Sequence, residues 1–209
     1  QALRQGLLAA FDRANRQGGI GGHKLRLVSM DDGYSPTRAL ANVQRLLHDI
    51  NTFAIVCPLG TPTIKAFLNS VIQSDNLVLG PYTGAEFLRQ PFVRNVVNLR
   101  MSYAHEIAAI AVMLQRINLT RIAVFYQDDS YGETILSAIQ TYHDYGTVNI
   151  VSRVQYKRNT TLVGEAVEQV LQDAPDVEAV VMAGTSDACA RFIHKLNARI
   201  KDTDHAVAY

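Results

Sequence analysis

The chain has 209 residues, of which 48% are hydrophobic and 19% are charged, and its formal net charge at pH 7 is +1. This composition supports a sizeable hydrophobic core and excludes a disordered chain, and the length fits one large α/β domain or two small lobes. So small a net charge gives no general electrostatic attraction to nucleic acid or to an anionic membrane, so we expect no nucleic-acid partner.

The first predicted elements are a helix over residues 1–17 and a strand over residues 24–30. Apolar residues recur at helical spacing in the first range, and Gly18-Gly19 suits a left-handed helix end. The chain therefore opens inside a helix with no strand before it, and residues 205–209 resemble the start of another strand. We expect the chain to be part of a longer protein.

Strands and helices then alternate along the rest of the chain. The expected strands cover residues 53–57, 76–79, 95–99, 121–126, 148–154 and 177–182; the expected helices begin at Ser35-Pro36 and Thr61-Pro62 and then cover residues 102–117, 131–145, 162–172 and 186–198. The S/T-x-x-E spacing predicts a capping box at residues 83–86, where a short helix should start, and a second capping box at residues 130–133, at the start of the helix over residues 131–145. This alternation is typical of parallel sheets with crossover helices, and the predicted fold class is α/β.

An internal similarity predicts two lobes of like architecture. Residues 27–34, LVSMDDGY, resemble residues 124–131, VFYQDDSY, and both are predicted as strand, Asp pair, small residue, Tyr and helix. We expect lobe one to cover residues 1–99 and lobe two residues 100–209, with the hinge near residues 98–102. Because Asp and small residues are also favoured at helix starts, the match fits two ordinary helix caps as well.

The loops between strands and helices contain the candidate binding residues. Ligands of open α/β sheets bind at the carboxyl ends of the strands, where helix N-termini offer unpaired N–H groups to anions. In Gly60-Thr61-Pro62-Thr63, the glycine lets backbone approach a ligand and the threonines add hydroxyl groups. The same spacing fits an ordinary capped helix, so both interpretations stay open here.

Three tyrosines follow predicted strand ends. Tyr82, Tyr103 and Tyr131 are each placed where an aromatic ring lines a cleft and presents a hydroxyl group. Plain packing is the alternative for any one of them. Thr83 is expected to cap the helix that follows it, whether or not a ligand binds.

Metal and catalytic chemistry are not expected. The pairs Asp31-Asp32 and Asp128-Asp129 resemble a magnesium pocket, but charge complementarity at helix starts accounts for them better. The histidines show no zinc spacing, and no nucleophile elbow or phosphate-binding loop is present. We therefore predict no cofactor, no metal and no enzymatic activity. Cys57 and Cys189 are expected to be buried free thiols, and their spacing cannot decide whether they form a disulfide.

The ordered set of motifs resembles a known family. Residues 11–25, FDRANRQGGIGGHKL, are similar to the A-x-x-x-I-N-x-x-G-G-I-x-G-x-K-L segment of type I periplasmic binding proteins, in particular the leucine/isoleucine/valine-binding proteins of ABC transporters. The similarity continues in order through Asp31-Asp32, Gly60-Thr61, Gly80-Pro81, residues 121–124 and residues 129–132. It implies two doubly wound parallel-sheet lobes, joined by a hinge and closing on a small ligand, of which this chain is a fragment.

The resemblance also implies one ligand site built from both lobes. In the family, hydroxyl and backbone N–H groups after the third and fourth strands of lobe one hold an amino acid's carboxylate. The matching positions are Gly60, Thr61, Tyr82 and Thr83 in lobe one, Tyr103 at the crossover, Tyr131 closing over the ligand, and Thr185 in lobe two. Gly60-Thr61-Pro62 replaces a Ser-Ser pair common in the family, which changes the carboxylate contact. The family's acidic partner for the ligand's ammonium group falls after residue 209.

The function that this resemblance implies is non-enzymatic. We expect a periplasmic or extracellular protein that captures an amino acid or related carboxylate for the permease of a membrane transporter. The alternative is the extracellular sensor domain of a membrane receptor, such as a kinase or cyclase, with its own transmembrane signalling module. A metal enzyme built on the Asp pairs is a third hypothesis. The sequence does not identify the ligand or the oligomeric state.

Overall fold

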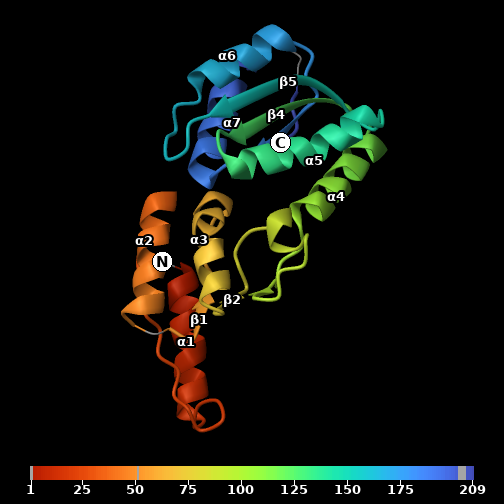
Figure 1. Ribbon diagram of the computed structural model, residues 1–209. Helices are drawn as coiled ribbons and strands as arrows, with labels where there is room; N and C mark the ends of the chain where they lie inside the picture. The colour runs from red at the N-terminus through yellow and green to blue at the C-terminus, as the bar shows by residue number, and fades with distance from the viewer. Residues whose placement is uncertain (1, 51, 202–205) are drawn as a thin grey trace.

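The computed structural model describes residues 2–50, 52–201 and 206–209, and the chain folds into two α/β lobes (Figure 1). Lobe one contains α1 (Ala2–Arg16), α2 (Pro36–His48), β1 (Ala54–Val56), α3 (Thr61–Gln73), β2 (Leu77–Leu79), the 3-10 turn η1 (Glu86–Leu88) and β3 (Val96–Val97). Lobe two contains α4 (Tyr103–Arg116), β4 (Arg121–Gln127), α5 (Ser130–Asp144), β5 (Asn149–Tyr156), α6 (Gly164–Asp173), β6 (Ala179–Ala183) and α7 (Ser186–Ile200). The predicted α/β class is confirmed. The first residue of the expected first helix and residue 205 of the expected last strand lie outside the described residues.

Each lobe has its own parallel sheet. The strand order is β1-β2-β3 in lobe one and β5-β4-β6 in lobe two, and every paired strand runs parallel to its neighbour. The carboxyl ends of the strands therefore share one edge of each sheet, and the helices that follow begin at that edge.

The sheet of lobe two is covered on both faces. Along β4, Ile122 and Val124 belong to the core with α4 and α5, whereas Ala123 and Phe125 belong to the core with α6 and α7. All four are fully buried, and the Phe125 ring stacks on Phe192 with centroids 4.3 Å apart. A strand covered on both faces needs apolar residues at every position, which explains the continuous apolar run.

The core of lobe one lies between its sheet and two helices. Val43 of α2, Phe67 of α3 and Val78 of β2 are buried in one cluster, and α1 contributes no buried residue to it. Phe87 of η1 packs against this cluster and also against the α4–α5 core of lobe two. The lobes are therefore joined by packing as well as by the connecting chain.

The expected strand over residues 24–30 is wrong. Within the described part of the chain, this segment is irregular apart from an isolated bridge between Ile20 and His23 just before it. A strand forms only where a neighbouring strand supplies partners for its backbone groups. Among the described residues, none fills that place.

Helices start at both of the predicted places, η1 and α5, but the predicted capping boxes themselves are wrong. The N-cap of α5 is Asp129, whose carboxylate accepts from the Tyr131 N–H, so Ser130 lies inside the helix. An ionised acceptor is the stronger cap. Ala85 precedes η1, and the Thr83 hydroxyl, which accepts from the Ala85 N–H at 3.2 Å, mainly contacts other hydroxyl groups. Tertiary contacts thus override the local spacing.

The cysteines are free thiols, as predicted, but the expected full burial is wrong, because Cys57 and Cys189 are both half-buried. Cys57 follows β1 and Cys189 lies in the first turn of α7, so both are near the strand ends. Burial raises the pKa of the Cys189 thiol above its ordinary value.

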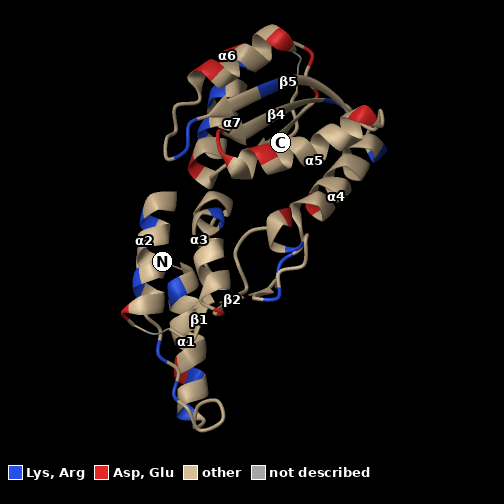
Figure 2. Cartoon of the chain, in the orientation of Figure 1, with Lys and Arg blue, Asp and Glu red and all other residues tan. Residues whose placement is uncertain are grey.

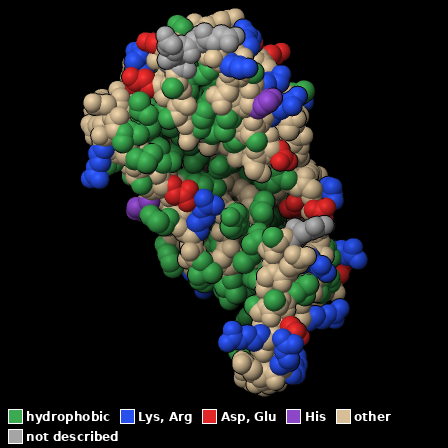
Figure 3. Space-filling model, turned by 180° about the vertical axis from the view of Figure 1, so that it is seen from behind, with side chains coloured by type: hydrophobic (Ala, Val, Ile, Leu, Met, Phe, Trp, Pro, Cys, Tyr) green, Lys and Arg blue, Asp and Glu red, His purple; other side chains and the backbone are tan. Residues whose placement is uncertain are grey.

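The outer surface carries dispersed charge. Lys, Arg, Asp and Glu residues are scattered over both lobes (Figure 2). Hydrophobic side chains gather in the middle of the face seen from behind (Figure 3). Among the helices of the described residues, none combines the length and apolarity needed to cross a membrane.

Candidate functional site

The carboxyl edges of the two sheets meet at the boundary between the lobes. In Figure 1, α2 and α3 of lobe one lie opposite α5 and α7 of lobe two. Direct contacts cross this boundary: the Gln127 amide donates to the Tyr34 hydroxyl at 3.2 Å, and the Asn159 amide donates to the Gly33 carbonyl at 3.4 Å. The candidate site is therefore built from both lobes.

Three hydroxyl groups form a buried cluster at the boundary, two from lobe one (Thr61 and Thr83) and one from the start of α4 in lobe two (Tyr103). The Thr61 and Thr83 Oγ1 atoms are 2.7 Å apart, and the Tyr103 hydroxyl oxygen lies 3.2 Å from Thr83 Oγ1. The exposed fractions of these residues are 1%, 0% and 6%. The structure thus brings together three of the predicted binding residues.

Glycines make this close packing possible. A β-carbon on Gly84 would lie 2.7 Å from the backbone nitrogen and the ring of Tyr103, so only glycine allows that tyrosine to approach Thr83. Gly60 is the N-cap of α3, has a φ of 98° and provides no side-chain cap. The first N–H groups of a helix have no intrahelical acceptor, and because Gly60 supplies no side-chain acceptor either, those of α3 are suited to an anion.

Tyr131 adjoins the Tyr103 end of the cluster, and both tyrosines belong to lobe two. Its ring centroid lies 5.4 Å from that of Tyr103, with the planes tilted by 50°. Burial raises the pKa of the Tyr131 hydroxyl above its ordinary value, and the neutral hydroxyl can donate a hydrogen bond. Thr61, Thr83, Tyr103 and Tyr131 therefore form one continuous group across the boundary.

Thr185 belongs to a separate network at the strand ends of lobe two. It is the N-cap of α7, its side chain caps no backbone N–H, and its own N–H donates to the Tyr156 hydroxyl at 2.8 Å. The Tyr156 hydroxyl in turn donates to Gln127 Oε1 at 2.9 Å. Thr185 is thus tied to the carboxyl ends of β4 and β5.

Tyr82 lies at the rim of the site and is 51% exposed. The Arg100 guanidinium lies 5.4 Å from the centroid of the Tyr82 ring and 5.5 Å from that of Tyr103. It also makes two hydrogen bonds to the Glu106 carboxylate, at 2.9 and 3.1 Å. The rim therefore carries a cation whose charge is already paired.

Three polar residues at the boundary were missed by the sequence analysis: Tyr34, Gln127 and Tyr156. Gln127 is fully buried, and its Nε2 also donates to Asp129 at 2.6 Å. The similarity of residues 27–34 to 124–131 pairs Tyr34 with Tyr131 and was the signal that could have identified Tyr34.

The acidic pairs serve the turns that contain them. Asp31 accepts from the Gly33 N–H at 3.0 Å, Asp32 from the Tyr34 N–H at 2.8 Å, and Asp129 from the Tyr131 N–H at 2.9 Å. Across residues 2–50, 52–201 and 206–209, no group of three or more His, Cys, Asp or Glu side chains is placed to hold a metal ion.

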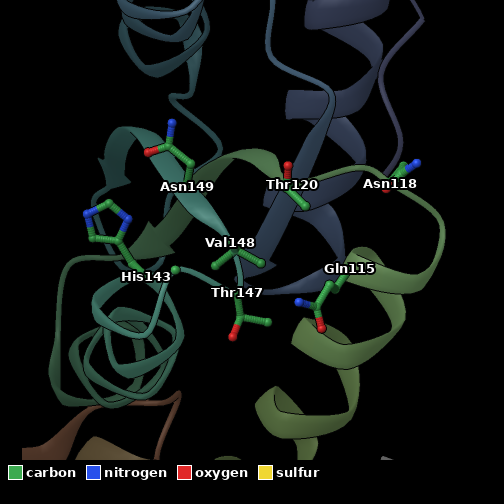
Figure 4. Close-up of a pocket in the computed structure, with 8 residues that line it drawn as sticks. Gln115, Asn118, Thr120, His143, Thr147, Val148 and Asn149 are labelled. Carbon is green, nitrogen blue, oxygen red and sulfur yellow. The ribbon is translucent and has the colours of Figure 1, made fainter.

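Two surface pockets lie away from this boundary and contain none of the predicted binding residues. One, of about 890 Å³, is next to the start of β2. The other, of about 320 Å³, lies at the start of β4 and β5 (Figure 4) and is lined by Gln115, Asn118, Thr120, His143, Gly146, Thr147, Val148 and Asn149. Ligands of parallel sheets bind at the opposite, carboxyl edge, so the interlobe boundary remains the candidate site.

Comparison with known proteins agrees with this architecture. The family model described as "Periplasmic binding protein" matches residues 1–199. The substrate-binding protein BasB of a chemotactic signal transduction system in Halobacterium salinarum is 25% identical over 197 residues, covering 91% of this chain and 46% of that protein. The Leu/Ile/Val-binding protein of Escherichia coli K12 is 26% identical over 140 residues, covering 66% of this chain and 37% of that protein.

A solved structure agrees in three dimensions. The possible leucine/isoleucine/valine-binding protein of Rhodopirellula baltica superposes with a TM-score of 0.84 at 33% identity, covering 98% of this chain and 56% of that chain. This chain spans less than half the length of the two curated relatives. Because the family model matches nearly every residue, the predicted membership is confirmed, and this chain belongs to the periplasmic binding protein family.

Proposed function

We propose that this chain is part of an extracytoplasmic solute-binding protein that holds an amino acid or a related small carboxylate between its lobes and delivers it to an ABC transporter permease. The chain supplies binding groups from both lobes, and the ligand is released unchanged. The protein works in the periplasm or outside the cell.

One observation carries this proposal: near the start of α3, the Thr61 and Thr83 hydroxyl groups of lobe one meet the Tyr103 hydroxyl of lobe two, whose ring lies beside that of Tyr131. A carboxylate accepts hydrogen bonds from hydroxyl groups and from the N–H groups of a helix N-terminus. Aromatic rings on the opposite side suit the apolar part of a small ligand. The names of the Escherichia coli and Rhodopirellula baltica relatives support a branched-chain amino acid as the first ligand to test.

Calorimetric titration of the complete protein with L-leucine, L-isoleucine, L-valine and benzoate tests the proposal. Thr61→Val removes one hydroxyl of lobe one and Tyr131→Ala removes the facing ring of lobe two. Each should weaken binding of the best ligand by about tenfold or more. Thr61→Val removes a hydrogen bond to a charged group, which contributes roughly 1.5–3 kcal/mol, and Tyr131→Ala removes apolar burial of roughly the same size.

Matched controls come from exposed positions. Thr161→Val and Tyr145→Ala make the same chemical changes at exposed residues and should leave the dissociation constant unchanged. Binding that is equally strong in Thr61→Val, Tyr131→Ala and their controls would contradict the site. Absence of heat or stabilisation with every carboxylate tested would contradict the ligand class.

A sensor function is the second candidate. The BasB protein, which matches 91% of this chain, is named as the substrate-binding protein of a chemotactic signal transduction system. The same cleft would then report ligand to a membrane signalling module in place of a permease. Co-purification of the complete protein with membrane components of either type, with and without ligand, distinguishes the two functions.

A further inference from the structure

Tyr34 connects the two lobes and is not among the residues assigned to the ligand. It precedes α2 in lobe one, and its hydroxyl oxygen accepts from the Gln127 Nε2 at the end of β4 in lobe two, at 3.2 Å. The neighbouring Gly33 carbonyl accepts from Asn159 Nδ2 at 3.4 Å. Two adjacent residues of lobe one are thus bonded to two strand-end segments of lobe two.

The backbone at Tyr34 adopts an unfavourable conformation to place this ring. Its φ is 57°, in the left-handed region that a bulky side chain rarely occupies. The Asp32 carboxylate holds the turn through the Tyr34 N–H, and the ring packs where a β-carbon on Gly60 would come within 2.3 Å of it. Strain of this kind persists only where surrounding contacts enforce it, and it often marks a functional position.

Gln127 is held ready for this contact. It is fully buried, and its Oε1 accepts from the Tyr156 hydroxyl at 2.9 Å. That bond fixes the orientation of the amide, so Nε2 faces lobe one, with one hydrogen toward Asp129 at 2.6 Å and the other toward Tyr34. If the lobes separate, this second hydrogen loses its protein acceptor, which costs free energy unless water replaces it.

The internal repeat gives Tyr34 a counterpart in lobe two. Asp32 accepts from the Tyr34 N–H at 2.8 Å, and Asp129 accepts from the Tyr131 N–H at 2.9 Å, so each lobe presents one tyrosine from the same kind of turn at a helix start. Tyr131 faces Tyr103, and Tyr34 faces Gln127. Both tyrosines of the repeat therefore take part in contacts at the boundary.

We propose that Tyr34 and Gln127 are positioning residues that form a closure contact and set the fraction of protein whose lobes are closed before ligand arrives. This inference rests on the proposed function, because the closed fraction f then sets the apparent dissociation constant as the intrinsic constant divided by f. The contact contributes to affinity without touching the ligand.

The test measures lobe separation in the ligand-free complete protein. Spin labels at Gln44→Cys in α2 and Glu165→Cys in α6, both exposed positions, report the interlobe distance distribution in a Cys57→Ser, Cys189→Ser background. Tyr34→Phe should lower the closed-to-open ratio by about fivefold, the effect of losing one hydrogen bond of typical net strength. Asn159→Ala should shift the distribution in the same direction, and Tyr145→Phe, at a 79% exposed residue, should not shift it.

Two results would overturn the inference. One is a distance distribution in Tyr34→Phe that matches that of Tyr145→Phe. The other is a lower unfolding midpoint in Tyr34→Phe with no change in lobe separation, which would assign the residue a purely structural role. Because this readout needs no ligand, it remains decisive if no amino acid binds, so failure of the proposed function is recognised separately. Where L-leucine binds, its apparent dissociation constant should rise in Tyr34→Phe by the same factor as the closed fraction falls.

Discussion

Replacing Thr83 by valine tests the hydroxyl cluster in its most buried member. Thr83 is fully buried, and its Oγ1 lies 2.7 Å from Thr61 Oγ1, 3.2 Å from the Tyr103 hydroxyl and 3.2 Å from the Ala85 nitrogen that donates to it. Valine keeps the shape and removes all three contacts. Each contributes roughly 1 kcal/mol net, so Thr83→Val should lower the free energy of unfolding by about 3 kcal/mol.

The matched control is Thr83→Ser, which keeps the hydroxyl and removes one methyl group. Its cost should be close to that of one buried methyl group, about 1 kcal/mol. Guanidinium chloride unfolding of the complete protein in the absence of ligand measures both variants, with the midpoint shifting and the slope unchanged. If Thr83→Val proves as stable as Thr83→Ser, the cluster is not a hydrogen-bonded unit and its proposed preorganisation is refuted.

Three further predictions follow from the same boundary. Gly60→Ala should lower the free energy of unfolding by roughly 1–3 kcal/mol through backbone strain, and by more because the added carbon displaces the Tyr34 ring. This loss should be larger than that of Gly146→Ala, where φ is 71° but no atom lies within 4 Å of the added carbon. Equal losses in the two variants would argue against the clash. Asp129→Ala removes the α5 cap and should lower the free energy of unfolding, measured with denaturant, by about 1–2 kcal/mol. An unchanged free energy of unfolding would contradict the capping role. Burial raises the pKa of Tyr34 to about 12 from 10.0. The contribution of its protonated hydroxyl to stability should therefore be complete below pH 10 and be lost as the pH rises from 10 to about 12. Over that interval the unfolding midpoint of Tyr34→Phe should fall less than that of the unsubstituted protein, and an identical fall would contradict this assignment.

Local sequence signals were sufficient for most of the elements. The apolar run of β4 predicted a strand covered on both faces, and the structure places α4 and α5 on one face and α6 and α7 on the other. The segment over residues 24–30 failed as a strand because alternation describes a suitable side-chain order and says nothing about whether a neighbouring strand is present.

The candidate site was only partly predictable for a related reason. Thr61 and Thr83 lie in or after the short loops that follow β1 and β2, so the common carboxyl edge of a parallel sheet brings them together. The contact between Tyr34 and Gln127 depends on how one lobe is placed against the other, which no local spacing encodes. The repeat pointed to Tyr34 as the counterpart of Tyr131, but only the assembled boundary shows what the residue contacts.

A crystal structure of the complete protein with its tightest-binding amino acid or carboxylate tests the central claim most directly. We predict the ligand's carboxylate at roughly 2.7–3.2 Å from the Thr61 or Thr83 hydroxyl, with Tyr131 covering it from lobe two. A ligand seated in the pocket beside His143, or held by one lobe alone with Tyr131 turned away, would contradict the account.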